Sequence, residues 1–75
     1  MNKAAATLRD WRERRDMSQK RAADILGMDQ AVLSKYENGK MLPSRKAAVS
    51  IEKVTTGLVK VADWDEPVTD TAAAG

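Results

Sequence analysis

The stretch from Ser18 to Gly39, SQKRAADILGMDQAVLSKYENG, decides the fold of this chain. Ser18 is suited to cap the first turn of a helix, and Gly27 allows the sharp turn with which that helix ends. A second helix is expected to start after Asp29 and to stop at Asn38-Gly39, because these residue types favour the left-handed conformation. The stretch is therefore interpreted as two short helices joined by a tight turn.

This is the layout of a helix-turn-helix, and its second helix has two opposed faces. At about 100° per residue, Val32, Leu33 and Tyr36 fall on one side and predict the buried face. The outward face carries Gln30, Ala31, Ser34 and Lys35. In the major groove a glutamine can bond adenine, a lysine can donate to guanine, and an alanine methyl can touch thymine. We therefore expect these four residues to contact bases.

Residues at the ends of the motif are expected to contact the DNA backbone. Free N–H groups at the start of a helix, amide side chains and lysines all bind phosphate oxygens. The candidate phosphate contacts are Gln19, Lys20, Asn38, Lys40 and Arg45.

The charge of the chain is unevenly distributed. Its 13 Lys and Arg and 11 Asp and Glu give a formal net charge of +2. All 13 basic residues and 7 of the acidic ones lie in residues 1–62, a net charge of +6, whereas residues 63–75 carry 4 acidic residues. A basic body followed by an acidic tail suggests a polyanionic partner for the body.

Composition excludes several classes of function. A chain of 75 residues has room for one domain. The absence of cysteine and histidine removes disulfides, thiolate sites, and the commonest general base and metal ligand, and it fits a reducing cytosol. No apolar run approaches the ~20 residues of a membrane span, and the start does not read as a signal peptide. We therefore expect no enzyme, no metal, no cofactor, no small-molecule substrate and no membrane association.

The segment before the motif predicts one more helix. It is expected to run from Leu8 to Arg15 behind Thr7 as N-cap, with Leu8 and Trp11 on its inward face. Residues 1–6 are expected to form a flexible N-terminus, and residues 7–65 the helix-turn-helix domain. Within the motif itself, Ile25 is expected to face inward beside Ala22 and Leu26.

The segment after the motif predicts a helix that follows Pro43-Ser44 and runs to about Thr55. Its apolar stripe of Ala47, Ile51, Val54 and Leu58 is expected in the core. Residues Leu58–Val61 alternate as in a short strand, but we favour a single helical turn over Val61–Trp64 that packs Trp64 against the domain. We expect all three aromatic residues in the core or at its edge, and residues 66–75 to form a disordered acidic tail.

The chain closely resembles the lambda-repressor-like (Cro/cI-type, XRE-type) helix-turn-helix proteins of phages and bacteria. The resemblance is carried by Leu8–Arg12, Ser18-Gln19, Ala22-Ala23, Leu26-Gly27, Ser34–Lys40 and Pro43-Ser44. It implies an all-α, compact bundle of four to five helices that forms a homodimer and binds a pseudo-palindromic operator. It also implies base contacts by Gln30, Ala31 and Lys35, backbone contacts by Gln19, Asn38 and Lys40, and a partly buried ion pair between Arg12 and Glu37.

Two classes of function remain open at this point. The first is a sequence-specific regulator of transcription that binds double-stranded DNA, a small phage or prophage repressor located in the cytoplasm with the nucleoid. The alternative is an antitoxin or accessory subunit whose main partner is a protein, with Val49, Val59, Val61 and the tail as its contact surface. Co-purification with a toxin would favour the alternative.

Overall fold

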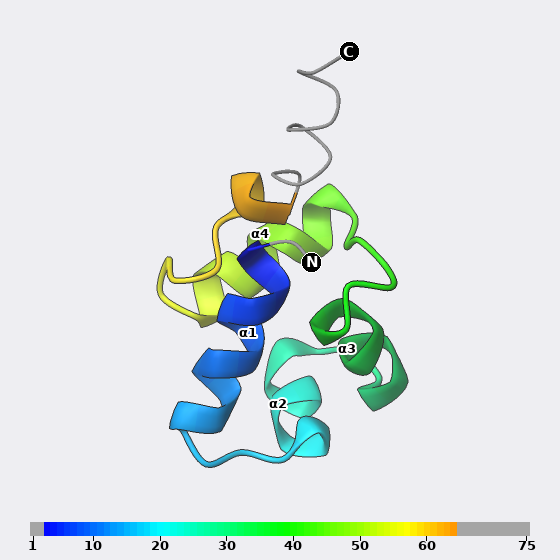
Figure 1. Ribbon diagram of the computed structural model, residues 1–75, viewed down its shortest axis with the longest axis vertical. Helices are drawn as coiled ribbons and strands as arrows, with labels where there is room; N and C mark the ends of the chain where they lie inside the picture. Colours follow the sequence, from blue (N-terminus) through cyan, green and yellow to red (C-terminus); the bar gives the residue numbers. More distant parts are fainter. Residues whose placement is uncertain (1–2, 65–75) are drawn as a thin grey trace.

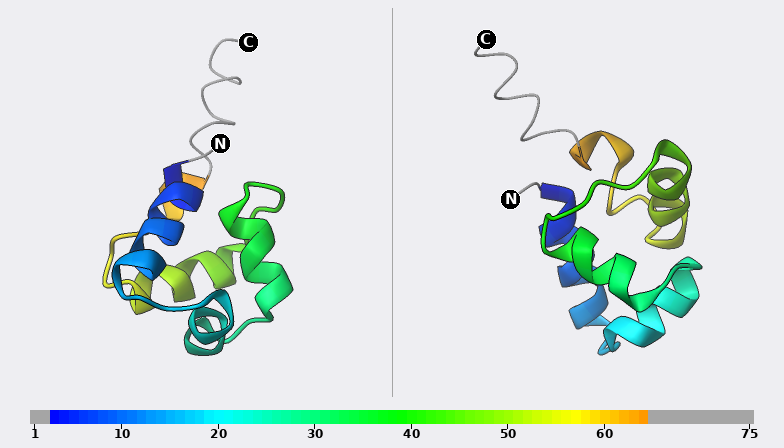
Figure 2. Two further views of the ribbon diagram at one scale, coloured as in Figure 1. Left: turned by 60° about the horizontal axis from the view of Figure 1, so that its bottom comes forward. Right: turned by 90° about the vertical axis from the view of Figure 1, so that its right-hand side faces the viewer.

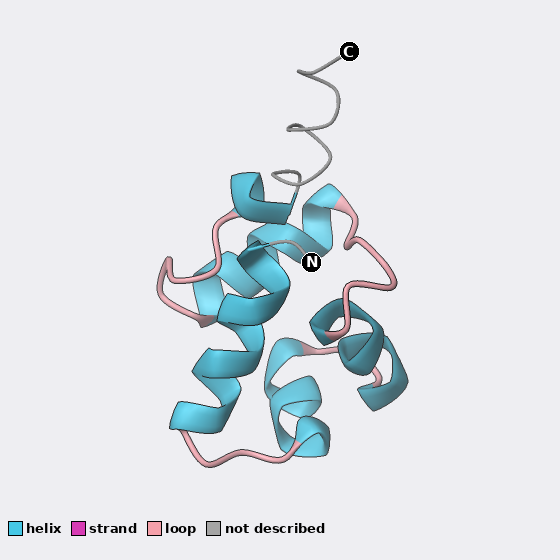
Figure 3. Cartoon of the chain, viewed as in Figure 1, coloured by secondary structure: helices cyan, strands magenta, loops and turns pink. Residues whose placement is uncertain are grey.

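The described part of the chain consists of helices joined by loops, without a strand. The computed structural model describes residues 3–64 of the 75. They form α1 (Lys3–Arg14), α2 (Gln19–Leu26), α3 (Gln30–Glu37), α4 (Arg45–Val54) and the 3-10 helix η1 (Val61–Trp64), as Figure 1, Figure 2 and Figure 3 show. The predicted all-α bundle is therefore confirmed.

Local capping fixes the ends of α2 and the start of α4. The Ser18 hydroxyl accepts a hydrogen bond from the Arg21 N–H at 3.1 Å, and the Ser44 hydroxyl accepts one from the Ala47 N–H at 3.2 Å. Gly27 ends α2 with φ of +74°, and the next N–H, of Met28, donates to the Ala23 carbonyl at 2.9 Å. The predicted boundaries at these residues are confirmed.

The predicted start of the first helix at Leu8 is wrong. Helix α1 begins at Lys3, so Thr7 lies inside it and donates its hydroxyl to the Lys3 carbonyl at 2.9 Å instead of capping it. Residues 3–6, expected in a flexible N-terminus, form the first turn, and Ala4 and Ala5 are fully buried. Alanine has the highest helix propensity and a small side chain, and α1 packs closely against η1 here.

The core lies where the four α-helices and η1 meet. Leu8, Leu33 and Ile51 are fully buried in it. The 3-10 helix η1 returns to α1 and α4 and places Trp64 against Tyr36, with ring centroids 5.8 Å apart and planes at 61°. Both predictions for this region, a single helical turn and a buried Trp64, are confirmed, and Trp11 is buried as well.

Two apolar residues predicted in the core lie at the surface. Ile25 is 46% exposed because the buried face of α2 is formed by Ala22, Ala23 and Leu26. Leu58 is 54% exposed because α4 ends at Val54, and the helical spacing that placed Leu58 in the stripe does not continue beyond that end. Of that stripe, Ile51 is buried, Val54 is partly buried against the core, and Ala47 is half-buried.

The predicted acidic tail of residues 66–75 lies outside the described residues. Within residues 3–64, no helix is both long enough and apolar enough to cross a membrane.

Candidate nucleic-acid interface

Helix α3 presents a polar face to solvent because its apolar face is fixed in the core. Leu33 is fully buried, Tyr36 is 6% exposed, and Val32 packs against the core. The side chains of Gln30, Ala31 and Lys35 are exposed. Figure 1 shows α3 at the right-hand edge of the bundle, next to α2. The structure thus places three of the four candidate base contacts together on one accessible face.

Ser34, the fourth candidate, is less accessible than the other three. Its side chain is half-buried, and its hydroxyl lies 3.4 Å from the side-chain amide nitrogen of Asn38, which donates to it. Asn38 itself is exposed at the end of α3. The bond links a candidate base contact to a candidate phosphate contact one helical turn away.

An ion pair joins α1 to the end of α3. Arg12 donates from Nε to Glu37 Oε2 at 2.8 Å and from Nη2 to Oε1 at 3.1 Å, the bidentate geometry typical of arginine and carboxylate. The side chains are 13% and 2% exposed, respectively. The hydrogen bond that Arg12 donates to Glu37 raises the pKa of Arg12 above its usual value. This is the pair that the family resemblance implies.

The same carboxylate also binds Gln19, a contact that the sequence did not predict. The amide nitrogen of Gln19 donates to Glu37 Oε1 at 3.1 Å. Positions 18 residues apart carry no local signal of pairing, so only the packing of α2 against α3 brings them together. A glutamine amide has two N–H donors, and the bond to Glu37 leaves the second available to a phosphate.

Arg12 also closes the loop that leads into α2. Its Nη1 donates to the Met17 carbonyl at 2.9 Å, one residue before the cap of α2. Arg12 therefore contacts both the loop before α2 and the last residue of α3. Through Glu37 and Gln19, one partly buried cluster determines how the two helices of the motif lie against α1.

The remaining candidate phosphate contacts are cations without acidic partners. Lys20 lies at the start of α2, Lys40 follows the left-handed Gly39, and Arg45 is the first residue of α4. All three side chains are exposed, and none forms an ion pair within residues 3–64. Their positive charges are therefore available to a polyanion.

Within the same described residues, no group of three or more acidic, histidine or cysteine side chains is arranged to hold a metal ion.

Comparison with known proteins identifies a family for most of the chain. A family model described as helix-turn-helix matches residues 8–55, from the middle of α1 to the C-cap of α4. Searches of curated proteins and of solved structures gave no match.

Proposed function

Because this chain belongs to the XRE-type, lambda-repressor-like helix-turn-helix family, it is a DNA-binding transcriptional regulator, and we propose that it acts as a small dimeric repressor of the phage or prophage type. The observation that carries the proposal is the exposed face of Gln30, Ala31 and Lys35 on a helix whose other face is anchored in the core. Three cations that form no ion pair within residues 3–64 complete the candidate surface: Lys20 on α2, Lys40 in the loop after α3, and Arg45 on α4.

In this proposal α3 enters the major groove and reads base edges. Gln30 bonds an adenine through its amide, Lys35 donates to guanine O6 and N7, and Ala31 contacts a thymine methyl. Gln19, Lys20, Asn38, Lys40 and Arg45 bind phosphates and set the register of the domain on the duplex.

The partly buried cluster of Arg12, Glu37 and Gln19 acts as a positioning device. It touches no base in this proposal, but it holds α3 against α1 and the start of α2. Because Gln19 is both a candidate phosphate contact and a partner of Glu37, the cluster fixes the distance between backbone contacts and base contacts.

Binding as a two-fold dimer sets the geometry of the operator. Two recognition helices related by a two-fold axis read half-sites one helical turn apart, about 34 Å. A dimer on such an operator represses by excluding polymerase, and its affinity falls steeply with salt.

Two lysine variants test the roles assigned to base and phosphate contacts. Lys35→Ala is expected to cost about 1–3 kcal/mol on the cognate site and to relax base preference there. Lys40→Ala is expected to weaken binding to all DNA sequences about equally. It should also reduce the slope of log affinity against log salt concentration by about one unit. Lys53→Ala removes the same charge from the end of α4 and serves as the control. Identical behaviour of the Lys35 and Lys40 variants would contradict the assignment.

Selection from random duplex DNA, read out by gel shift, tests the proposal as a whole. Enrichment of one palindrome supports it, and no enrichment overturns it in favour of the antitoxin or accessory alternative. That alternative predicts a contact surface that includes Val59. The prediction is wrong for this residue, because Val59 is fully buried in the core. Val49 and Val61 are only half-buried.

A further inference from the structure

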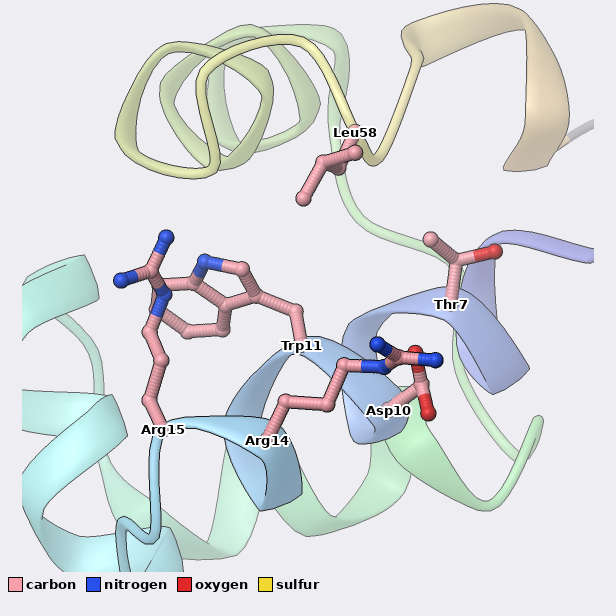
Figure 4. A pocket seen from close by; sticks show the side chains of 6 residues that line it. All are labelled: Thr7, Asp10, Trp11, Arg14, Arg15 and Leu58. Carbon is pink, nitrogen blue, oxygen red and sulfur yellow. The ribbon is translucent and has the colours of Figure 1, made fainter.

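A pocket of about 360 Å³ lies between α1 and the loop that follows α4. Its lining consists of Thr7, Asp10, Trp11, Arg14, Arg15 and Leu58 (Figure 4). Figure 1 shows α1 and this loop on the left of the bundle and α3 on the right. None of the proposed DNA contacts lines the pocket, so the DNA-binding role does not account for it.

The indole of Trp11 brings an unused hydrogen-bond donor to this pocket. Trp11 is 5% exposed, and its Nε1–H has no acceptor in the part of the chain that the structure describes. In Figure 4 the indole nitrogen faces the space between the Arg15 guanidinium and Leu58. Burying an N–H without an acceptor is unfavourable, so an oxygen atom placed here would recover a hydrogen bond that the free protein lacks.

Arg15 adds a positive charge to the same space. Its guanidinium carbon lies 5.5 Å from the centroid of the Trp11 ring, and Arg15 forms no ion pair within residues 3–64. Arg14, across the pocket, is neutralised by Asp10 at 2.8 Å. One charged donor and one neutral donor that face the same space suit a carboxylate, which accepts from both.

Most of the surface that lines the pocket is apolar. The Trp11 ring forms one wall, and Leu58, 54% exposed, forms the rim. A pocket of this size with an apolar lining and a few convergent polar groups is typical of small-ligand sites. The indole N–H is covered by its neighbours, but Arg15 and Leu58 are exposed side chains that change rotamer rapidly and can admit a ligand.

We propose that this pocket binds a carboxylate attached to an apolar group. The carboxylate accepts hydrogen bonds from Trp11 Nε1 and the Arg15 guanidinium, and the apolar group packs between the Trp11 ring and Leu58. The carboxylate can come from a free small acid or from Asp65, Glu66 or Asp70, which follow Trp64 in the sequence.

Indole N–H resonances of the ¹⁵N-labelled full chain test the proposal directly, with phenylacetate as probe. Trp64 provides an internal control because its Nε1–H also lacks a partner within residues 3–64 but does not line the pocket. We expect phenylacetate to shift the Trp11 resonance with a Kd on the order of millimolar and to leave Trp64 unchanged. Trp11→Phe assigns the two signals.

Matched ligands and variants separate recognition of the carboxylate from apolar adsorption. Phenylacetamide has the same ring without the charge and is expected to bind about 5-fold more weakly. Arg15→Gln is expected to cause a similar loss, whereas Arg9→Gln removes an exposed α1 cation that does not line the pocket and should leave the Kd unchanged. Equal shifts with acid and amide, equal shifts of both tryptophans, or no shift would overturn the proposal.

Neutralising the acidic residues after Trp64 distinguishes the two sources of the carboxylate. If Asp65→Asn/Glu66→Gln/Asp70→Asn shifts the Trp11 resonance without probe and tightens phenylacetate binding, the chain supplies its own carboxylate. If the variant behaves as the parent chain does, the site serves a free acid.

Discussion

Replacing Arg12 with methionine removes one side of the ion pair that links α1 to the recognition helix. Methionine keeps the length of the side chain but has no donor for Glu37 or for the Met17 carbonyl. Glu37 is 2% exposed, so its carboxylate cannot gain water in exchange. After the substitution its remaining partner among these residues is the neutral amide of Gln19.

The burial of Glu37 sets the size of the effect. Removing one partner of a buried pair costs about 3–5 kcal/mol, because the other charge stays buried without compensation. A domain of this size has a total free energy of unfolding of about 3–9 kcal/mol. Arg12→Met should therefore remove a large part of the stability. Arg12→Lys keeps the charge but loses the bidentate geometry, and we expect an intermediate loss of about 1–2 kcal/mol.

Urea unfolding followed by circular dichroism measures these free energies. Arg14→Met is the matched control, because Arg14 pairs with Asp10 on the same helix while both side chains are exposed, 79% and 60%. An exposed pair of this kind contributes little, and we expect a loss below about 0.5 kcal/mol. The contrast between two arginines two residues apart isolates the effect of burial.

A double variant separates an uncompensated charge from lost packing. Replacing both Arg12 and Glu37 with methionine removes the pair without leaving a buried charge, so it should be more stable than Arg12→Met alone. A loss below about 1 kcal/mol for Arg12→Met, or additive losses in the double variant, would refute the reasoning.

Three further substitutions test the elements that hold the motif. Gly27→Ala should lower the free energy of unfolding, measured by thermal unfolding, by about 1 kcal/mol. Gly27 has φ of +74° and an added Cβ would meet no other atom, so the loss comes from backbone conformation alone. Gly27→Asn should lose less, because asparagine tolerates the left-handed conformation better. Ser44→Ala should cost about 1 kcal/mol in urea unfolding, since the Ala47 N–H loses its acceptor; no change would mean that water replaces the cap. Trp64→Ala should cost about 3–5 kcal/mol through the cavity left beside Tyr36, and a loss below about 1 kcal/mol would show that η1 adds little.

The candidate site was predictable as far as it depends on one helix. The opposed faces of α3 follow from the spacing of Gln30, Ala31 and Lys35 against Leu33 and Tyr36, which a helix of any fold would preserve. The bond between Gln19 and Glu37 was not predictable, because it joins residues on different helices. The half-burial of Ser34 was not predictable either, because it depends on how the rest of the domain packs around α3.

The wrong predictions of the fold arose where tertiary packing or a turn of the backbone overrides local sequence patterns. Ala4 and Ala5 are buried, although alanine carries little hydrophobic signal, because close packing against η1 selects small side chains. Leu58 was placed by continuing the periodicity of α4 past its end. There the backbone turns through Thr56 and Gly57, with φ of +55° and +86°, so the side chain leaves the stripe.

The sequence by itself determined where α2, α3 and α4 begin and end, and which face of α3 is polar. Caps and turns such as Ser18, Gly27 and Ser44 act through hydrogen bonds within a few residues, so local chemistry is enough to specify them. Only the tertiary structure decided which residues share the Glu37 carboxylate and which alanines are buried. Those outcomes depend on contacts between segments distant in sequence, and their free energy exists only once the helices have packed.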